Sequence, residues 1–134
     1  MSGFAVSGTK SFPTIIFNPR DNVFHIRGIS IPENGKEFYE PVITWLEAYS
    51  IRPNEKTELL IDLEYFNLST SKAILFLFYR LNEMQDAGHK VSVVWCYRDA
   101  YILSAGRDYA FMVKIPFEFR KVNSKDHVPQ EFFN

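Results

Sequence analysis

The sequence contains little cysteine and no excess of charge of either sign. Cys96 is the single cysteine among 134 residues, which excludes an intrachain disulfide framework and a multi-cysteine zinc site and favours a reducing compartment. Fifteen Lys and Arg residues are balanced by sixteen Asp and Glu residues, for a formal net charge of −1. A chain without a basic excess has little with which to neutralise a phosphate backbone, so we expect no nucleic-acid binding.

Long apolar runs and a secretory signal are also missing. The longest strongly apolar run, 73–78, is far shorter than the roughly 20 residues that cross a bilayer. Residues 1–10 carry no charged segment ahead of a long apolar core. We therefore expect a cytoplasmic protein that does not associate with membranes. His25, His89 and His127 stand far apart without a metal-binding spacing, so we expect no metal and no other cofactor.

The composition that remains is typical of one globular domain. Hydrophobic residues make up 46% of the chain and aromatic residues 16%, which is enough to close a core. We expect a single domain over 1–134, with its core at about 8–122 and a loosely held C-terminal tail over 123–134.

The apolar patterns predict strands alternating with helices. We expect an antiparallel hairpin from 14–17 and 23–29, strands over 58–63, 91–97 and 115–122, and helices over 38–49, from near 69 to 86, and over 99–113, the last in one piece or two. This ββαβαβαβ order predicts an α/β sandwich, with helices packed on a mainly parallel core sheet that has an antiparallel start.

The start of the first helix is less regular than its middle. Ser30 to Glu33 fits a capping box. Gly35 and Pro41 then oppose a regular helix, so we expect a loop, a short turn or a kink before the regular part.

The main cluster of polar side chains that could bind or accept a ligand follows the strand that ends near Leu63. In parallel sheets the carboxyl ends of the strands are where ligands usually meet the protein. Three hydroxyl residues, Ser69, Thr70 and Ser71, follow Asn67 at this point. A helix amino terminus presents unpaired N–H groups and a positive dipole end, which accommodate a phosphate. These residue types are also the commonest helix caps, so a capping role stays open beside a phosphate-accepting one.

Two carboxylates near the same junction permit an enzymatic alternative. Asp62 and Glu64 lie two positions apart on a strand and therefore share a face, where they could act as an acid/base pair. Together with the Ser69–Ser71 cluster they would make a small hydrolase or a ligand-binding domain. The sequence has no recognisable nucleophile–base pair, and a strand end emerging into solvent is the commoner explanation of such carboxylates.

The second helix presents an outward aromatic stripe. Its inner face is formed by Ile74, Leu77, Phe78, Leu81 and Met84. The opposite side then carries Lys72, Phe76, Tyr79 and Glu83. Exposed aromatics at this spacing suit a protein interface. A neighbouring subunit, as in a homodimer, or the C-terminal tail could equally cover them.

Motifs spread over residues 8–121 follow one another in a set order. They are Ser30–Asn34, Glu37–Pro41, Trp45–Leu46, Glu64–Asn67 with Ser69 and Lys72, and the stretch through Gly106, Asp108 and Pro116–Phe117. In order and spacing they resemble the SiaC family of small bacterial regulatory phosphoproteins. That family is similar in fold to the STAS domain of anti-sigma-factor antagonists, in agreement with the predicted element order.

The resemblance implies a partner-switching protein rather than an enzyme. In the family, the unphosphorylated form binds and activates a diguanylate cyclase (a GGDEF protein), which raises cyclic di-GMP and favours biofilm. A dedicated Ser/Thr kinase phosphorylates a hydroxyl at the start of the second helix, and a PP2C-type phosphatase removes the phosphate.

The resemblance also carries over to residues, with one departure. The family's acceptor directly follows the Asn, where this chain has Leu68. We therefore predict Ser69, or else Thr70, as the acceptor; the alternative is a chain that stays unphosphorylated and always able to bind. The predicted switch loop and partner surface consist of Tyr65, Asn67, Ser71, Lys72, Phe76 and Tyr79.

Overall fold

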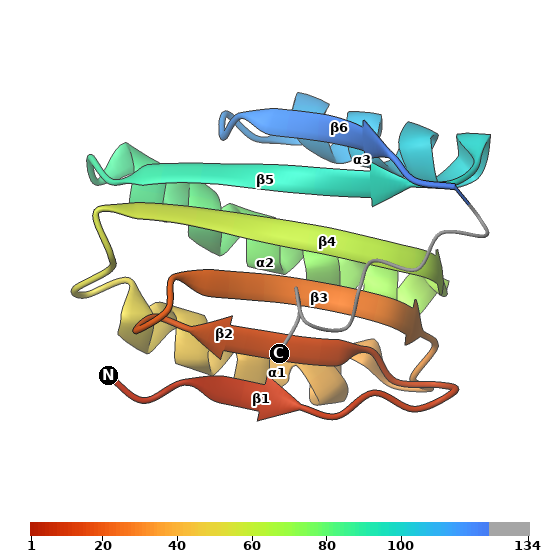
Figure 1. The fold of residues 1–134 in the computed structure, drawn as a ribbon, viewed down its shortest axis with the longest axis horizontal. Helices are drawn as coiled ribbons and strands as arrows, with labels where there is room; N and C mark the ends of the chain where they lie inside the picture. The colour runs from red at the N-terminus through yellow and green to blue at the C-terminus, as the bar shows by residue number, and fades with distance from the viewer. Residues whose placement is uncertain (124–134) are drawn as a thin grey trace.

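The computed structural model describes residues 1–123, so the tail expected over 123–134 lies, from residue 124 on, outside the described residues. The strands are β1 (Phe4–Val6), β2 (Thr14–Asn18), β3 (Val23–Ser30), β4 (Lys56–Phe66), β5 (Lys90–Tyr97) and β6 (Phe117–Lys121). The helices are α1 (Gly35–Tyr49), α2 (Leu68–Asp86) and α3 (Ala100–Met112). Figure 1 shows these elements as one sheet with helices behind it. No described helix is long and apolar enough to cross a membrane.

The six strands form one sheet in which spatial order equals chain order. β1 pairs with β2 and β2 with β3 in antiparallel fashion, whereas β3 to β6 run parallel to one another. The predicted mixed α/β architecture, with an antiparallel start and a parallel core, is therefore confirmed, and it is compatible with a STAS-like arrangement. All three helices lie on the same side of the sheet (Figure 1).

The core lies between this side of the sheet and the helices. Ile61 of β4 and Val93 of β5 are fully buried, and Val91 is nearly so. The predicted inner face of α2 is buried against them: Ile74, Leu77, Phe78, Leu81 and Met84. α1 and α2 are thus both packed on one face of the sheet, as the periodicity of their apolar residues predicts.

The start of α1 differs from the prediction. Ser30 is the buried last residue of β3 and caps no helix. The cap is Asn34, whose side-chain oxygen accepts a hydrogen bond from the Glu37 backbone N–H at 3.1 Å. The expected loop before the helix is confined to 31–34, and the helix begins at Gly35 and continues through Pro41.

Other element boundaries also shift. β1 was not predicted from the sequence, and β4 extends beyond the predicted range 58–63 at both ends. α2 begins one residue before Ser69, because Asn67 is its cap. α3 is one helix rather than two, and the last strand begins at Phe117, after Pro116.

Candidate functional site

The amino end of α2 is tied to the segment that precedes α1. The Asn67 side-chain oxygen accepts from the Thr70 backbone N–H at 3.0 Å, the usual capping bond. Its amide nitrogen donates to the Pro32 carbonyl at 2.8 Å, and its backbone N–H donates to the Ser30 carbonyl at 3.1 Å. Asn67 thus serves both as a helix cap and as a link between two connections far apart in sequence.

Thr70 is fully buried beneath this cap. Its hydroxyl donates to the Ser30 carbonyl at 3.0 Å and lies 2.9 Å from the Ser30 hydroxyl. The Ser30 hydroxyl in turn lies 2.8 Å from the Tyr39 hydroxyl of α1. Burial raises the pKa of Tyr39 to about 12, so the cluster is neutral near pH 7. A kinase could reach the Thr70 hydroxyl only after this end of the domain opened.

Ser69 occupies the contact between the amino ends of α1 and α2. It is half-buried, and its hydroxyl accepts from the Gly35 backbone N–H at 3.0 Å. The same hydroxyl donates to the Pro32 carbonyl at 3.1 Å, with the Asn67 side-chain oxygen as a second acceptor at 3.3 Å. A Cβ atom at Gly35 would lie only 2.5 Å from the Ser69 carbonyl oxygen. The two helix ends therefore touch through backbone at this point.

Ser71 and Leu68 complete the first turn of α2. The half-buried Ser71 donates its hydroxyl to the Leu68 carbonyl at 2.6 Å, a bond within the turn. The Ser71 carbonyl accepts from the Tyr109 hydroxyl of α3 at 2.7 Å, and burial raises the pKa of that tyrosine. Leu68, by contrast, is 72% exposed. The three neighbouring hydroxyls thus have different environments, and Leu68 is more exposed than any of them.

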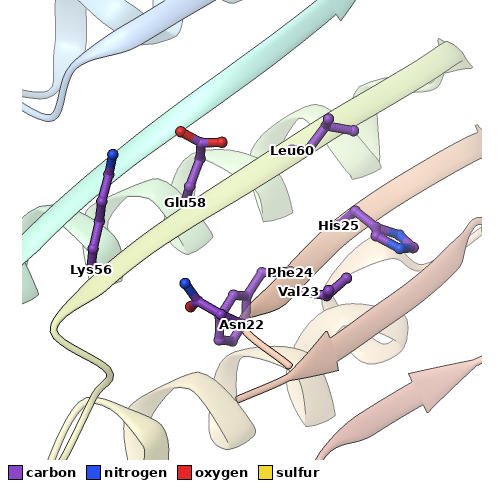
Figure 2. A pocket seen from close by; sticks show the side chains of 7 residues that line it. All are labelled: Asn22, Val23, Phe24, His25, Lys56, Glu58 and Leu60. Carbon is purple, nitrogen blue, oxygen red and sulfur yellow. The ribbon is translucent and has the colours of Figure 1, made fainter. Parts of the chain in front are cut away.

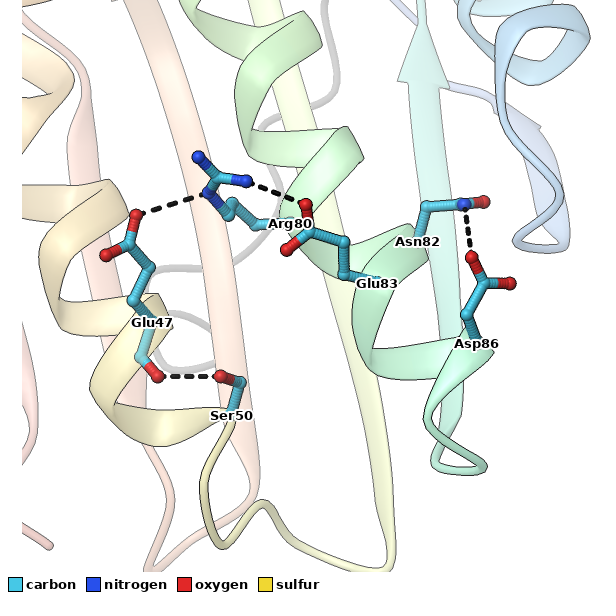
Figure 3. Close-up of polar contacts among 6 residues, drawn as sticks. All are labelled: Glu47, Ser50, Arg80, Asn82, Glu83 and Asp86. Carbon is cyan, nitrogen blue, oxygen red and sulfur yellow. Dashed lines mark hydrogen bonds and ion pairs between the residues drawn. The ribbon is translucent and has the colours of Figure 1, made fainter.

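A groove of about 500 Å³ runs between α1 and α2. Its lining includes Gly35, Ile43, Ser69, Ala73, Phe76 and Arg80. Ser69 lies at the end where both helices begin. Further along, Arg80 bridges the two helices by an ion pair with Glu47 at 3.2 Å, and it also pairs with Glu83 at 2.8 Å (Figure 3). The groove is therefore apolar along its middle, with a hydroxyl at one end and an ion pair towards the other.

The outward stripe of α2 faces solvent as predicted. Phe76 is 56% exposed and Tyr79 39%, and their rings lie 6.4 Å apart in an edge-to-face arrangement. Lys72 and Leu68 are exposed on the same side, and Tyr65 is exposed at the end of β4. These five exposed residues lie at the end of β4 and along α2, and we call the set the α2 stripe.

The carboxylates of the enzymatic alternative lie elsewhere. Asp62 alternates with the core residue Ile61 and so projects to the side of the sheet without helices. Its carboxylate is buried and held by both terminal nitrogens of Arg98, at 2.5 and 3.3 Å. Glu64 is exposed. The described contacts bring neither carboxylate to the Ser69 or Thr70 hydroxyl. Within residues 1–123, no three His, Cys, Asp or Glu side chains gather as metal ligands.

The residues that hold the hydroxyls in place were not predicted from the sequence. Ser30 ends β3, and Pro32 and Gly35 belong to the connection into α1 and to its first turn; all three lie more than thirty positions before the α2 residues that they contact. Their proximity could have been predicted only from the topology of the sheet. β3 and β4 are parallel neighbours, so the connections that follow their carboxyl ends meet at one edge of the sheet.

Known proteins resemble this chain over nearly its whole length. The family model described as SiaC family regulatory phosphoprotein matches residues 6–122. An uncharacterized protein of Pseudomonas aeruginosa strain UCBPP-PA14 is 29% identical over 119 residues, which cover 87% of this chain and 94% of that protein.

Solved structures of SiaC from Pseudomonas aeruginosa share the fold. One superposes with a TM-score of 0.83 at 29% identity, covering 91% of this chain and all of that chain. Another is SiaC in a crystal structure of the diguanylate cyclase SiaD in complex with its activator SiaC, with a TM-score of 0.82 at 26% identity, covering 89% of this chain and 99% of that chain. The chain therefore belongs to the SiaC family of regulatory phosphoproteins.

Proposed function

We propose that this chain is a non-enzymatic regulator that binds and activates a diguanylate cyclase, under the control of phosphorylation at the amino end of α2. The observation that carries the proposal is the fold shared with SiaC, which is an activator bound to its cyclase SiaD in one solved structure. By the family resemblance, a dedicated kinase and a PP2C-type phosphatase would set the phosphorylation state. The single cysteine supports action in the cytoplasm, where thiols stay reduced.

The α2 stripe is the proposed cyclase-binding surface. Phe76 and Tyr79 are large aromatic residues on the exposed side of α2, whose other side is buried. Exposed aromatic residues of this kind often anchor protein interfaces. Phe76 also lines the groove between α1 and α2, so a partner that covers the stripe would lie beside Ser69.

Ser69 is the proposed phosphate acceptor. Its hydroxyl is half-buried, whereas that of Thr70 is fully buried among Ser30 and Tyr39. A phosphate there would add about −1.5 to −2 charges. The amino ends of α1 and α2 both lie next to this hydroxyl, and their dipoles favour negative charge.

The packing around Ser69 supplies a mechanism for control. Its hydroxyl is enclosed between the Gly35 N–H at 3.0 Å and the Pro32 carbonyl at 3.1 Å. A phosphate cannot fit into that space, so the start of α1 must move away from α2. That movement alters the groove beside the α2 stripe and places charge where a partner must exclude water. Phosphorylation therefore weakens cyclase binding.

Cyclase activation is tested with the diguanylate cyclase of the source organism. The purified chain should raise the rate of cyclic di-GMP formation from GTP. A variant with Phe76→Ser and Tyr79→Ser should bind the cyclase at least about tenfold more weakly. The matched control carries Tyr101→Ser and Phe111→Ser on α3, where both side chains are also exposed. No stimulation by the unaltered chain overturns the proposal, and equal losses in both variants overturn the assignment of the surface.

The phosphorylation step has its own test. Incubation with the cognate kinase and ATP, followed by phosphosite mapping, should place the phosphate on Ser69. The Ser69→Ala variant should remain unphosphorylated, and Ser71→Ala should be modified normally. Absence of phosphate throughout 67–72 would mean that Leu68 leaves the chain permanently competent to bind, and control by phosphorylation would be rejected.

A further inference from the structure

The two most exposed aromatic side chains among residues 1–123 both lie on α3. Phe111 is 94% exposed and Tyr101 88%, more than any other large hydrophobic residue in this range. Met112, beside Phe111, is 55% exposed. Large apolar side chains left in water on one helix mark an interaction surface. The cyclase-binding surface proposed on α2 does not include them.

Two polar residues complete a stripe along this helix. Tyr101, Ser104, Asp108 and Phe111 follow one another in steps of three, four and three residues, and all four are exposed. At 3.6 residues per turn, this spacing places them along one side of the helix, opposite its buried residues. We call these four residues the α3 stripe. It is about 15 Å long, at a rise of 1.5 Å per residue.

The α3 stripe lies apart from the α2 stripe. α3 stands at one end of the row of helices, with α2 between it and α1 (Figure 1). The buried side of α3 packs on the sheet and on α2, where the Tyr109 hydroxyl donates to the Ser71 carbonyl at 2.7 Å. The exposed side, with the stripe, is turned away from both. A partner could therefore occupy it without meeting the groove between α1 and α2.

The arrangement of the stripe is self-complementary. Its two ends are aromatic and its two middle residues are polar, and the steps of three, four and three are the same in both directions. A second copy of α3, packed antiparallel, therefore places its Phe111 against Tyr101 and its Asp108 against Ser104. The Ser104 hydroxyl can donate to the Asp108 carboxylate of the other copy. Two-fold symmetry forms each of these contacts twice.

The charges also suit a second copy of this chain. Arg107 is exposed beside Asp108, so an antiparallel pair brings the cation of each copy towards the anion of the other. The formal net charge of −1 gives little overall repulsion between two copies. The stripe is therefore complementary to itself in charge as well as in shape.

The size of the stripe predicts a weak dimer. Two aromatic side chains of about 150–250 Å² each supply about half of the roughly 800 Å² that each partner buries in a stable interface. Ser104, Asp108 and Met112 add to this area at the centre and at one edge. We therefore expect an association that depends on protein concentration in the micromolar range.

A pocket elsewhere on the molecule has a different character. It has a volume of about 290 Å³ and lies beside the beginnings of β3 and β4 (Figure 2). Lys56, Glu58 and Asn22 are among the residues that line it, so a cation, an anion and an amide are mixed there. This lining indicates no single class of ligand, whereas the α3 stripe matches a defined one.

We propose that two copies of this chain associate through their α3 stripes, antiparallel and related by two-fold symmetry. The inference is independent of the proposed cyclase activation, which uses residues of α2. A chain that has lost the dimer keeps the α2 stripe and still binds the cyclase.

Sedimentation equilibrium tests the dimer. The average mass of the unaltered chain should rise from that of one copy towards that of two as its concentration increases. Tyr101→Ser combined with Phe111→Ser should weaken association at least about tenfold. The matched control combines Phe76→Ser and Tyr79→Ser, the exposed aromatics of α2, and should dimerise normally. A chain that stays monomeric at every concentration overturns the proposal, and so do equal losses in the two variants.

A charge exchange tests the antiparallel pairing. Ser104→Asp places a second carboxylate opposite Asp108 of the other copy and should weaken the dimer at least about tenfold. Adding Asp108→Lys should restore it, because each new carboxylate then faces an ammonium group. In a parallel pair the same two changes would set like charges against each other. Failure of the second change to restore the dimer would reject the antiparallel arrangement.

Discussion

The amino ends of α2 and α3 are capped in the same way but have different surroundings. Each helix follows a parallel strand and is capped by the residue before it: Asn67 accepts from the Thr70 N–H at 3.0 Å, and Asp99 accepts from the Ile102 N–H at 2.9 Å. At α3 the next side chains are Ala100 and Tyr101, both exposed. At α2, two of the three residues that follow Leu68 bond to the connection before α1 or to the end of β3.

The difference shows that the polar residues of the α2 end have tertiary as well as capping roles. A cap alone needs one side-chain acceptor, as Asp99 demonstrates. The additional bonds of Asn67, Ser69 and Thr70 join α1, α2 and β3 at one point. A change at this end should therefore affect stability more than the equivalent change at α3, and the variants below test that difference.

The largest effect is expected from Gly35→Ala. The added Cβ would lie 2.5 Å from the Ser69 carbonyl oxygen and 2.6 Å from its carbonyl carbon, and backbone atoms cannot rotate away. We expect a loss of about 3 kcal/mol in the free energy of unfolding, measured by urea denaturation. Ala100, the first residue of α3, already carries a Cβ in an exposed position. A Gly35→Ala variant as stable as the parent would mean that the two helix ends do not touch.

Thr70→Val should cost about 2 kcal/mol of unfolding free energy. The substitution keeps the shape of the side chain but removes the hydroxyl that contacts Ser30, so the buried hydroxyl and carbonyl of Ser30 each lose one of their two partners. Ser71→Ala is the control, because its hydroxyl bonds only within its own turn; it should change stability by less than about 0.5 kcal/mol. Equal costs for the two variants would remove the distinction between buried and local hydroxyls.

The two caps can be compared directly. Asp99→Ala should lower the free energy of unfolding by about 1 kcal/mol, the usual cost of losing a helix cap. Asn67→Ala should cost about 2 kcal/mol, because it also removes the bond from the amide to the Pro32 carbonyl at 2.8 Å. Thermal and urea denaturation of both variants give the comparison. A larger loss at Asp99 would reverse the proposed ranking of the two helix ends.

The smallest effect is a pH dependence in the alkaline range. Tyr39 has its pKa raised by burial to about 12, above the ordinary value of 10.0. A raised pKa in the folded state means that its stabilising contribution is complete below pH 10 and is lost as pH rises from 10 towards 12. Tyr39→Phe should therefore reduce the slope of unfolding free energy against pH above 10, by about 1 kcal/mol per pH unit at pH 11. Tyr101→Phe at the exposed end of α3 should leave the slope unchanged.

Much of the fold follows from apolar periodicity alone. The buried strands around Ile61 and Val93 and the inner face of α2 are explicit in the order of residues, because long periodic segments leave few alternatives. β1 was missed because three residues at a sheet edge carry too little pattern, and their pairing with β2 supplies the structure. The first turn of α1 was misjudged because Gly35 is explained by a contact with Ser69, thirty-four positions away.

The site was predicted in its location and less well in its geometry. Parallel strand ends and the cluster of hydroxyls indicate the start of α2, and the outward orientation of Phe76 and Tyr79 follows from helical spacing. Sequence could not tell that Thr70 is buried and Ser69 half-buried. Exposure there depends on how the connection through Pro32 folds over the turn, which is a tertiary property.

The strand order of the sheet also bears on how the chain folds. Within residues 1–123, each strand pairs only with the strands directly before and after it in sequence, so no pairing among them has to wait for a distant segment. Keeping contacts local in this way lowers the entropy of loop closure and speeds folding. During synthesis, the β1 to β3 meander can form first and then template β4, β5 and β6 in turn as each emerges. We expect assembly of the sheet to proceed in one direction, from the amino-terminal edge outward.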